Sequence, residues 1–272
     1  MLLKNKIAIV YGAGGSLGSA VSKAFAKAGA KVYVTGHKID PLRKLAAGII
    51  SAGAVAEAAE VDALNKDSVE NFVEMVVNDA GAIDISFNAI SLQDVQGIPL
   101  VNMEIGDFLR PIEIAMKSQF ITSVAAARQM IKQQSGTILT LTATPGGIGY
   151  ANVGGFGPAC CAIESFSRDL ASEVGPYGVR AVNIRSGGSP DSRVFKDALE
   201  QNGDEAKEFI KKMEDDTMLK KMPLMEDIAN TAVFLVSDNA SKITGVTIDV
   251  TCGTTQALNY KVTPIAFVRN AE

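Results

Sequence analysis

The sequence predicts a doubly wound α/β fold, in which about seven parallel strands form one sheet with helices on both faces. Short β-branched runs alternate with longer amphipathic segments along most of the chain. The first of these runs leads into a glycine-rich turn and then a helix, which is the order of a phosphate-binding βα unit. No internal repeat or low-complexity linker interrupts the alternation, so we expect residues 1–272 to form a single domain.

The first half of the chain contains four predicted strands and three predicted helices. Each strand is a short apolar run, which is typical of a strand buried inside a sheet. The first helix is amphipathic, because Leu17, Val21 and Phe25 recur on one face, and Gly29 ends it. The predicted strands span residues 7–11, 31–35, 55–61 and 83–87, and the helices span about 17–28, 40–51 and 65–80.

The second half continues the alternation with longer helices and one irregular insertion. Parallel strands joined through helices need right-handed crossovers, which place helices on both faces of the sheet. The polar, charged segment 189–222 breaks the alternation, and we expect it to form a lid beside the ligand site. The predicted helices span about 105–134, 157–175 and 225–237, and the strands span 137–142, 179–185 and 246–250.

Charge and hydropathy argue against a nucleic-acid or membrane partner. The chain has 26 basic and 30 acidic residues, and its basic clusters are short, as at 211–212 and 220–221. Proteins that bind nucleic acids need denser groups of Lys and Arg. The chain has no run of about 18 apolar residues, the length that spans a bilayer. Its first residues do not resemble a secretory signal, so we expect a cytoplasmic protein.

The cysteines and the single histidine exclude several kinds of site. The cysteines are Cys160, Cys161 and Cys252; their number is odd and two are adjacent, which favours neither a disulfide framework nor a zinc site. His37 is the only histidine, so one chain cannot supply a two-histidine metal site. A Ser-His-Asp triad would have to use His37. We expect no bound metal.

The segment 10–18, between the first strand and the first helix, has the composition of a dinucleotide-binding turn. Gly12 can make the tight turn, and Gly18 lets the helix pack close to the sheet. Gly14 and Gly15 allow the backbone to approach a pyrophosphate. The helix N-terminus then supplies unpaired N–H groups and the positive end of its dipole. The alternative is a tight turn that binds no ligand.

Further motifs follow this turn along the chain. They are Asp62 after the third strand, Asp84-Ile85 and Asn88 at the fourth, Val182-Asn183 in the sixth, and the stretch from Asp227 to Gly245. Together with the turn, they resemble the short-chain dehydrogenase/reductase (SDR) family from about residue 5 to 253. That family's turn reads Thr-Gly-x-x-x-Gly-x-Gly, and this sequence has Tyr11 in place of the Thr and Ser16 in place of the middle Gly.

The resemblance implies a single Rossmann domain that binds NAD(P)(H) and acts as an oxidoreductase. It implies that Asp62 hydrogen-bonds the adenine amine and that Asn88 borders the ribose. It also implies a homodimer or homotetramer formed through the two long helices, and the low-charge faces at 125–127 and 159–163 are compatible with such contacts. The expected cofactor-binding residues are Gly12, Gly14, Ser16, Leu17, Gly18, His37, Lys38, Asp62 and Asn88.

The end of the second predicted strand favours NADP(H) over NAD(H). A carboxylate at this position accepts hydrogen bonds from the ribose hydroxyls and repels a 2′-phosphate. This chain has Gly36, His37 and Lys38 there, so the acid is absent and positive charge is near. The alternative is that His37 and Lys38 are merely solvated loop residues.

The positions that carry catalysis in the family hold different side chains here. By resemblance, the reaction needs an Asn, a Ser, a Tyr and, four residues after the Tyr, a Lys. The end of the fifth strand places Ala143 at the Ser position, and the same spacing places Phe156 at the Tyr and Cys160 at the Lys position. The long helix places Ala115 at the Asn position.

None of these side chains can perform the family's proton transfer. Phenylalanine has no titratable proton, alanine has no donor, and cysteine carries no fixed positive charge. A shift of one residue would place Gly155 or Gly157 at the Tyr position, which is no better. Tyr150 is the nearest phenol, but Gly154 rather than a lysine follows it at the same spacing. We therefore expect no catalytic residue by the family rule, with Tyr150 as a substitute.

Three functions are compatible with this sequence. One is an SDR-family oxidoreductase whose hydride transfer is atypical and uses Tyr150, a water or the substrate's own acid. The alternative is a non-catalytic Rossmann scaffold or nucleotide-binding protein, a pseudoenzyme. The third is covalent chemistry at Cys160 or Cys161, although no Lys or His lies nearby in sequence to lower a thiol pKa. We favour a divergent family member that binds NADP(H) but does not use Tyr-Lys catalysis on a small-molecule substrate.

Overall fold

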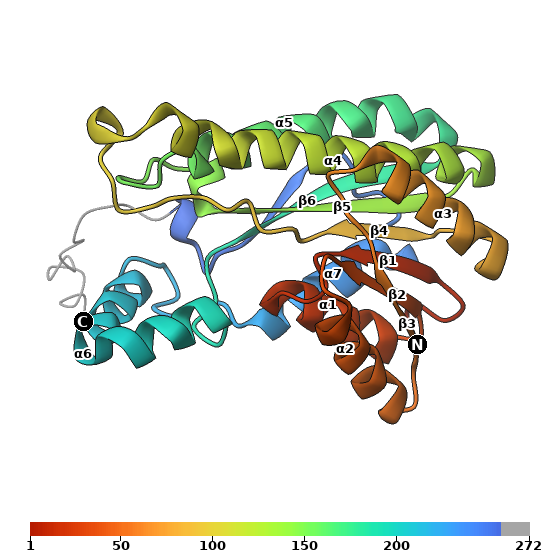
Figure 1. Ribbon diagram of the computed structural model, residues 1–272, viewed down its shortest axis with the longest axis horizontal. Coiled ribbons are helices and arrows are strands. Elements are labelled where there is room, and N and C mark those ends of the chain that lie inside the picture. The colour runs from red at the N-terminus through yellow and green to blue at the C-terminus, as the bar shows by residue number, and fades with distance from the viewer. Residues whose placement is uncertain (257–272) are drawn as a thin grey trace, which may run out of the picture.

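Seven parallel strands form one sheet within residues 1–256, the part of the chain that this computed structural model describes (Figure 1). The strand order is β3-β2-β1-β4-β5-β6-β7, so the order reverses between β1 and β4. The predicted doubly wound α/β fold is confirmed. The strands are β1 (Ile7–Tyr11), β2 (Lys31–Gly36), β3 (Val55–Glu60), β4 (Ile85–Asn88), β5 (Gly136–Ala143), β6 (Val179–Ser186) and β7 (Thr247–Val250).

Helices cover both faces of the sheet. Figure 1 shows α1, α2 and α7 on one side and α3, α4 and α5 on the other. None of the helices within residues 1–256 is both long and apolar enough to cross a membrane. The helices are α1 (Ser16–Lys27), α2 (Ile39–Ser51), α3 (Lys66–Ala80), α4 (Ile105–Gln133), α5 (Phe156–Val174), α6 (Arg193–Asp215) and α7 (Met225–Val236).

An apolar core lies on each face of the sheet. On the side of α1, Phe25 and Phe87 meet edge to face with ring centroids 6.5 Å apart. On the side of α3, Tyr33 and Phe72 meet in the same way at 6.1 Å. Because the central strands contribute side chains to both cores, they are apolar along most of their length. This explains why short apolar runs in the sequence predicted the strands.

The largest boundary difference concerns the fourth strand. The sequence predicts a start at residue 83, but β4 begins at Ile85. The Ile83 N–H donates instead to the side-chain oxygen of Gln133, at 3.0 Å. The first contact with β1 is made by Asp84, whose carboxylate accepts from the Ile7 N–H at 2.8 Å. A side chain of α4 therefore takes the place of a strand partner at residue 83.

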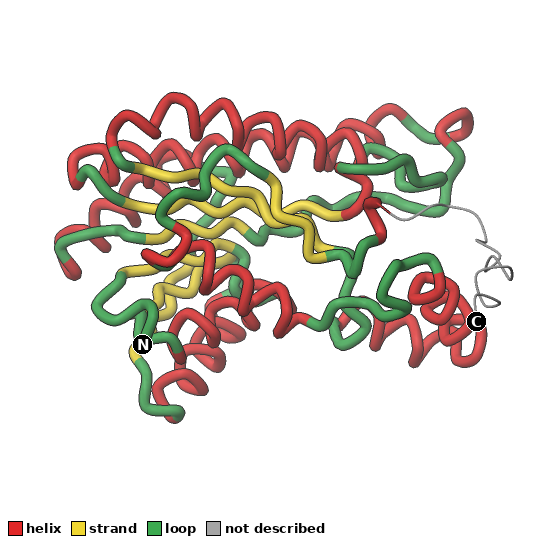
Figure 2. Tube along the Cα trace, turned by 180° about the vertical axis from the view of Figure 1, so that it is seen from behind, coloured by secondary structure: helices red, strands yellow, loops and turns green. Residues whose placement is uncertain are grey.

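The segment 189–222 extends past the carboxyl edge of the sheet. It contains α6, which Figure 2 shows set apart from the helices that cover the sheet. Gly203 interrupts this helix with φ 50° and ψ −118°. Ala206 is the buried residue of α6, so most of the helix is in contact with solvent. The polar, charged segment noted in the sequence thus contains a largely solvated helix.

The small apolar residues expected to face a second subunit lie inside the chain. Residues 125–127 of α4 are buried in the core on the α3 side of the sheet. Ala159 and Ile163 of α5 are buried against Ala115 of α4. Residues 125–127, Ala159 and Ile163 are therefore not available to a partner, because α4 and α5 use them to pack against each other and the sheet, whereas Cys161 is exposed. The exposed apolar side chains of α4 include Phe120, which is 59% exposed.

Candidate functional site

The candidate site lies at the carboxyl edge of the sheet, where the strand order reverses. Open α/β sheets bind ligands at such a switch point. β1 ends at Tyr11, and residues 12–15 lead from it into α1. β4 ends at Asn88, which is the register partner of Tyr11. The structure therefore places the glycine-rich turn directly beside the end of β4.

Close packing requires two glycines of the turn. Gly12 has a φ of 74°, and a Cβ there would lie 2.6 Å from the carbonyl oxygen of Ala89. A Cβ on Gly18 would collide with the carbonyl oxygen of Gly12. A Cβ on Gly14, by contrast, would meet no atom nearer than 3.9 Å. Packing of the chain does not require glycine at 14, and the turn leaves room for a methyl-sized group there.

Two helix N-termini meet at this turn. α1 begins at Ser16, and no side chain caps its first N–H groups. The Ser16 Oγ accepts a hydrogen bond from the N–H of Arg193, the first residue of α6, at 3.0 Å. Both helix starts carry partial positive charge, so together they favour an anion such as a phosphate. Leu17 instead packs against the core on the α1 side of the sheet.

The predicted adenosine contacts converge at the ends of β2 and β3. The His37 Nε2 lies 3.8 Å from the Asp62 Oδ1, and these side chains are 61% and 47% exposed. The Asp62 Oδ1 also accepts from the Leu64 N–H at 2.9 Å, which fixes the carboxylate. Lys38 is exposed at the start of α2 and forms no ion pair with residues 1–256. The structure thus brings His37 and Asp62 together beside Lys38.

Asn88 and Tyr11 are turned into the protein. The Asn88 amide donates to the Thr122 Oγ1 at 3.0 Å and accepts from the Ile90 N–H at 3.1 Å. The first contact joins the end of β4 to α4, and the second holds the chain segment that follows β4. Tyr11 is 1% exposed, and burial raises the pKa of its phenol. Its hydroxyl has no hydrogen-bond partner among the described residues.

Ala143 and Cys160 are brought together at the carboxyl end of β5. Ala143 is the last residue of β5, and its backbone contacts the thiol of Cys160. Phe156 is the first residue of α5 and is half-buried. Ala115, on α4, is fully buried against α5. The structure therefore brings Ala143 and Cys160 together, with Phe156 one turn earlier on α5 and Ala115 packed against α5, and none of the four side chains offers an ionised group.

The two adjacent cysteines have different surroundings. Cys160 is fully buried, and burial raises the pKa of its thiol to about 12. Cys161 is exposed, with its Sγ 3.6 Å from the carbonyl oxygen of Gly146. Because the thiolate is the nucleophilic form, the raised pKa disfavours covalent chemistry at Cys160.

A buried ionic network lies beside these residues, and the sequence did not reveal it. Arg185 of β6 donates two hydrogen bonds, of 2.9 and 2.6 Å, to the carboxylate of Glu164 in α5. The same guanidinium contacts both carboxylate oxygens of Asp249 in β7 at 3.1 Å. The Arg185 and Glu164 side chains are only 11% and 6% exposed. Thr142 and Thr255 donate to the two carboxylates, so the network joins α5, β5, β6, β7 and the segment after β7.

This network supports the loop after β5. A Cβ on Gly147 would lie 2.7 Å from Arg185 Nη1 and 2.5 Å from Thr255 Cγ2. A Cβ on Gly146 would collide with the Glu164 carboxylate. The loop therefore rests directly on the network. A charged residue near the end of β6 and another on the buried face of α5 were the signals available in the sequence.

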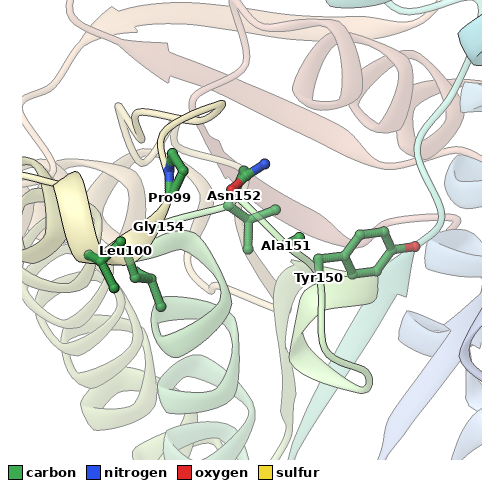
Figure 3. Close-up of a pocket in the computed structure, with 8 residues that line it drawn as sticks. Pro99, Leu100, Tyr150, Ala151, Asn152 and Gly154 are labelled. Atoms are coloured by element: carbon green, nitrogen blue, oxygen red, sulfur yellow. The ribbon is translucent and has the colours of Figure 1, made fainter.

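Tyr150 lines a small pocket between two loops (Figure 3). The pocket has a volume of about 250 Å³ and is lined by residues 99–101 and 150–154. Figure 3 shows the Tyr150 hydroxyl pointing away from Pro99 and Leu100. No lysine is among the lining residues. The phenol therefore has no cationic partner among the residues of this pocket.

Comparison with known proteins places the whole fold among dehydrogenases and reductases. Residues 12–255 match the family model described as enoyl-(acyl carrier protein) reductase. The chain is 29% identical over 257 residues to 7alpha-hydroxysteroid dehydrogenase of Escherichia coli strain K12, covering 94% of this chain and 97% of that protein. It is 28% identical over 250 residues to secoisolariciresinol dehydrogenase of Forsythia intermedia, covering 89% and 86%.

Solved structures agree with this placement. The crystal structure of an NAD⁺-bound xylitol dehydrogenase superposes with a TM-score of 0.86 at 25% identity, covering 92% of this chain and 99% of that one. A gluconate dehydrogenase-like protein from Agrobacterium tumefaciens also gives 0.86 at 25% identity, covering 94% and 98%.

Proposed function

The chain belongs to the short-chain dehydrogenase/reductase family of oxidoreductases, and on that basis we propose that it binds NADP(H) without using the family's Ser-Tyr-Lys proton transfer. The observation that carries the proposal is the end of β5, where the backbone of Ala143 meets a buried, neutral Cys160 thiol. A positioned acid or base contributes about 10²–10⁴ to a reaction rate. Without one, ordinary ketone reduction is expected to be slow.

Nucleotide binding is supported by the glycine-rich turn after β1 and by the helix starts beside it. The turn has room at Gly14, and the helix starts at Ser16 and Arg193 favour a pyrophosphate. We propose that residues 189–222 act as a lid, because α6 begins at this contact. The Lys38 ammonium and the His37 imidazole lie where a 2′-phosphate would bind, and the positive charge of Lys38 favours NADP(H) over NAD(H).

Fluorescence titration of the purified protein with NADPH and NADH tests this proposal. We expect NADPH to bind more tightly. The substitution Lys38→Ala should weaken the binding of NADPH by about tenfold, because roughly one charge-assisted hydrogen bond is lost. The affinity for NADH should change little. Lys44→Ala, also exposed on α2, is the matched control and should change neither affinity.

Two results would overturn this proposal. Absence of binding by either nucleotide would exclude the nucleotide-binding function. Equal weakening of both nucleotides by Lys38→Ala would show that Lys38 does not recognise the 2′-phosphate.

We also propose a homodimer or homotetramer formed through the outer faces of α4 and α5. Phe120 of α4 is 59% exposed, and its ring lies 6.5 Å from that of Phe166 on α5. Phe166 is half-buried, and an exposed aromatic ring such as Phe120 beside it is typical of an interface. Light scattering should give a mass of two or four chains, and the mass of one chain would contradict the proposal.

A further inference from the structure

The two halves of the candidate nucleotide site offer different chemistry. Dinucleotides lie across the switch point, with one mononucleotide over each half of the sheet. The half over β2 and β3 carries the exposed side chains of His37, Lys38 and Asp62. These groups can pair with a phosphate, a ribose or an adenine amine. The adenosine half therefore has charged partners in solvent contact.

In the half over β5 and β6, the Cys160 thiol and the Arg185 guanidinium are closed off. Cys160 is fully buried, and its raised pKa keeps the thiol neutral. The guanidinium of Arg185 is held by Glu164 through two bonds and by Asp249 through two more. A guanidinium has five N–H donors, and these four contacts involve all three of its nitrogens. Arg185 is thus unavailable to a ligand placed at the end of β5.

We infer that the chain recognises adenosine 5′-diphosphate nucleotides as a class. The part of the nucleotide beyond the second phosphate, which is the second ribose with its nicotinamide, adds little affinity. This inference rests on the proposed nucleotide binding. Its physical basis is that buried neutral groups cannot supply the charge-assisted hydrogen bonds that hold ribose hydroxyls strongly. The phosphates and the adenosine end supply the affinity. The nicotinamide is therefore not a requirement for binding.

Calorimetric titration of the full chain with a shortened series of ligands tests this inference. The series is NADPH, then 2′-phospho-ADP-ribose, which lacks nicotinamide, then 2′-phospho-ADP, which also lacks the second ribose. We expect all three dissociation constants to lie within about fivefold of one another. Reduced nicotinamide mononucleotide alone should not bind at concentrations that saturate the protein with NADPH.

The outcomes separate this inference from the proposed function. If NADPH binds more than about fivefold tighter than 2′-phospho-ADP, or if the mononucleotide binds, the inference is wrong although nucleotide binding stands. If none of the ligands binds, the proposed function fails, and the inference fails with it.

A gain-of-affinity variant provides a second readout. Cys160→Lys introduces a cation at the end of β5. It should strengthen the binding of NADPH and of 2′-phospho-ADP-ribose by about tenfold and leave the affinity for 2′-phospho-ADP unchanged. Cys161→Lys, on the next and exposed position of α5, is the control and should change none of them. If Cys160→Lys folds, shown by an unchanged circular dichroism spectrum, and strengthens no ligand, the inference is contradicted.

Discussion

The triple variant Ala143→Ser/Phe156→Tyr/Cys160→Lys is expected to reduce ketones with NADPH at least about 10²-fold faster than the native chain. The new phenol supplies the proton that Phe156 cannot supply. The new lysine lowers the pKa of that phenol, because a nearby positive charge favours the phenolate. The serine hydroxyl then holds the substrate oxygen. Ala143 ends β5 beside Cys160, and Phe156 begins α5 one helical turn before Cys160.

Each single change should have little effect, because the phenol, the cation and the hydroxyl act together. The measurement is NADPH oxidation followed by absorbance with a panel of small ketones. The triple variant should be active and the three single variants should remain near the native rate. If Phe156→Tyr alone reached the rate of the triple variant, the proposed cooperation with position 160 would be wrong.

The substitution Arg185→Met should lower the free energy of unfolding by about 3–5 kcal/mol. It removes the guanidinium and leaves Glu164 as a buried carboxylate with no opposite charge beside it. Asp249 loses its partner as well, although it is 32% exposed and water can solvate it in part. The loop after β5, which rests on the network, should lose its support at the same time.

Urea denaturation measures this effect against two controls. Arg128→Met removes an exposed pair with Glu70 and should cost less than about 1 kcal/mol. The double variant Glu164→Met/Arg185→Met removes both buried charges and should recover most of the stability, since apolar replacement of a buried pair is often neutral. If Arg185→Met cost no more than Arg128→Met, the network would not be a stabilising feature.

Local patterns were enough to predict the elements of this fold. The apolar runs of β1 and β2 and the amphipathic spacing of α1 each act over fewer than about 20 residues, so they are readable without tertiary information. The roles of Gly12 and Gly18 were also readable, because a turn between a strand and a helix needs glycine where backbones approach. The structure shows these close approaches directly.

Contacts between distant segments were not readable in this way. Ser16 and Arg193 are 177 positions apart, and nothing near either residue indicates that they meet. Arg185 and Glu164 are joined only after β6 has paired and α5 has packed on it. The alanines at 125–127 suggested a contact with a second subunit, but they are buried inside the chain. A helix face of low charge can pack equally well against either, so the sequence could not distinguish the two.

The rate of ketone reduction by the unmodified protein at saturating NADPH tests the central proposal most directly. Enzymes typically turn over about 1–10³ substrate molecules per second, and we expect this chain to be at least about 10²-fold slower on ordinary alcohol–ketone pairs. Turnover within the typical range would contradict the proposal that proton transfer at Ala143, Phe156 and Cys160 is absent. Loss of that turnover in Tyr150→Phe would then identify Tyr150 as the proton donor.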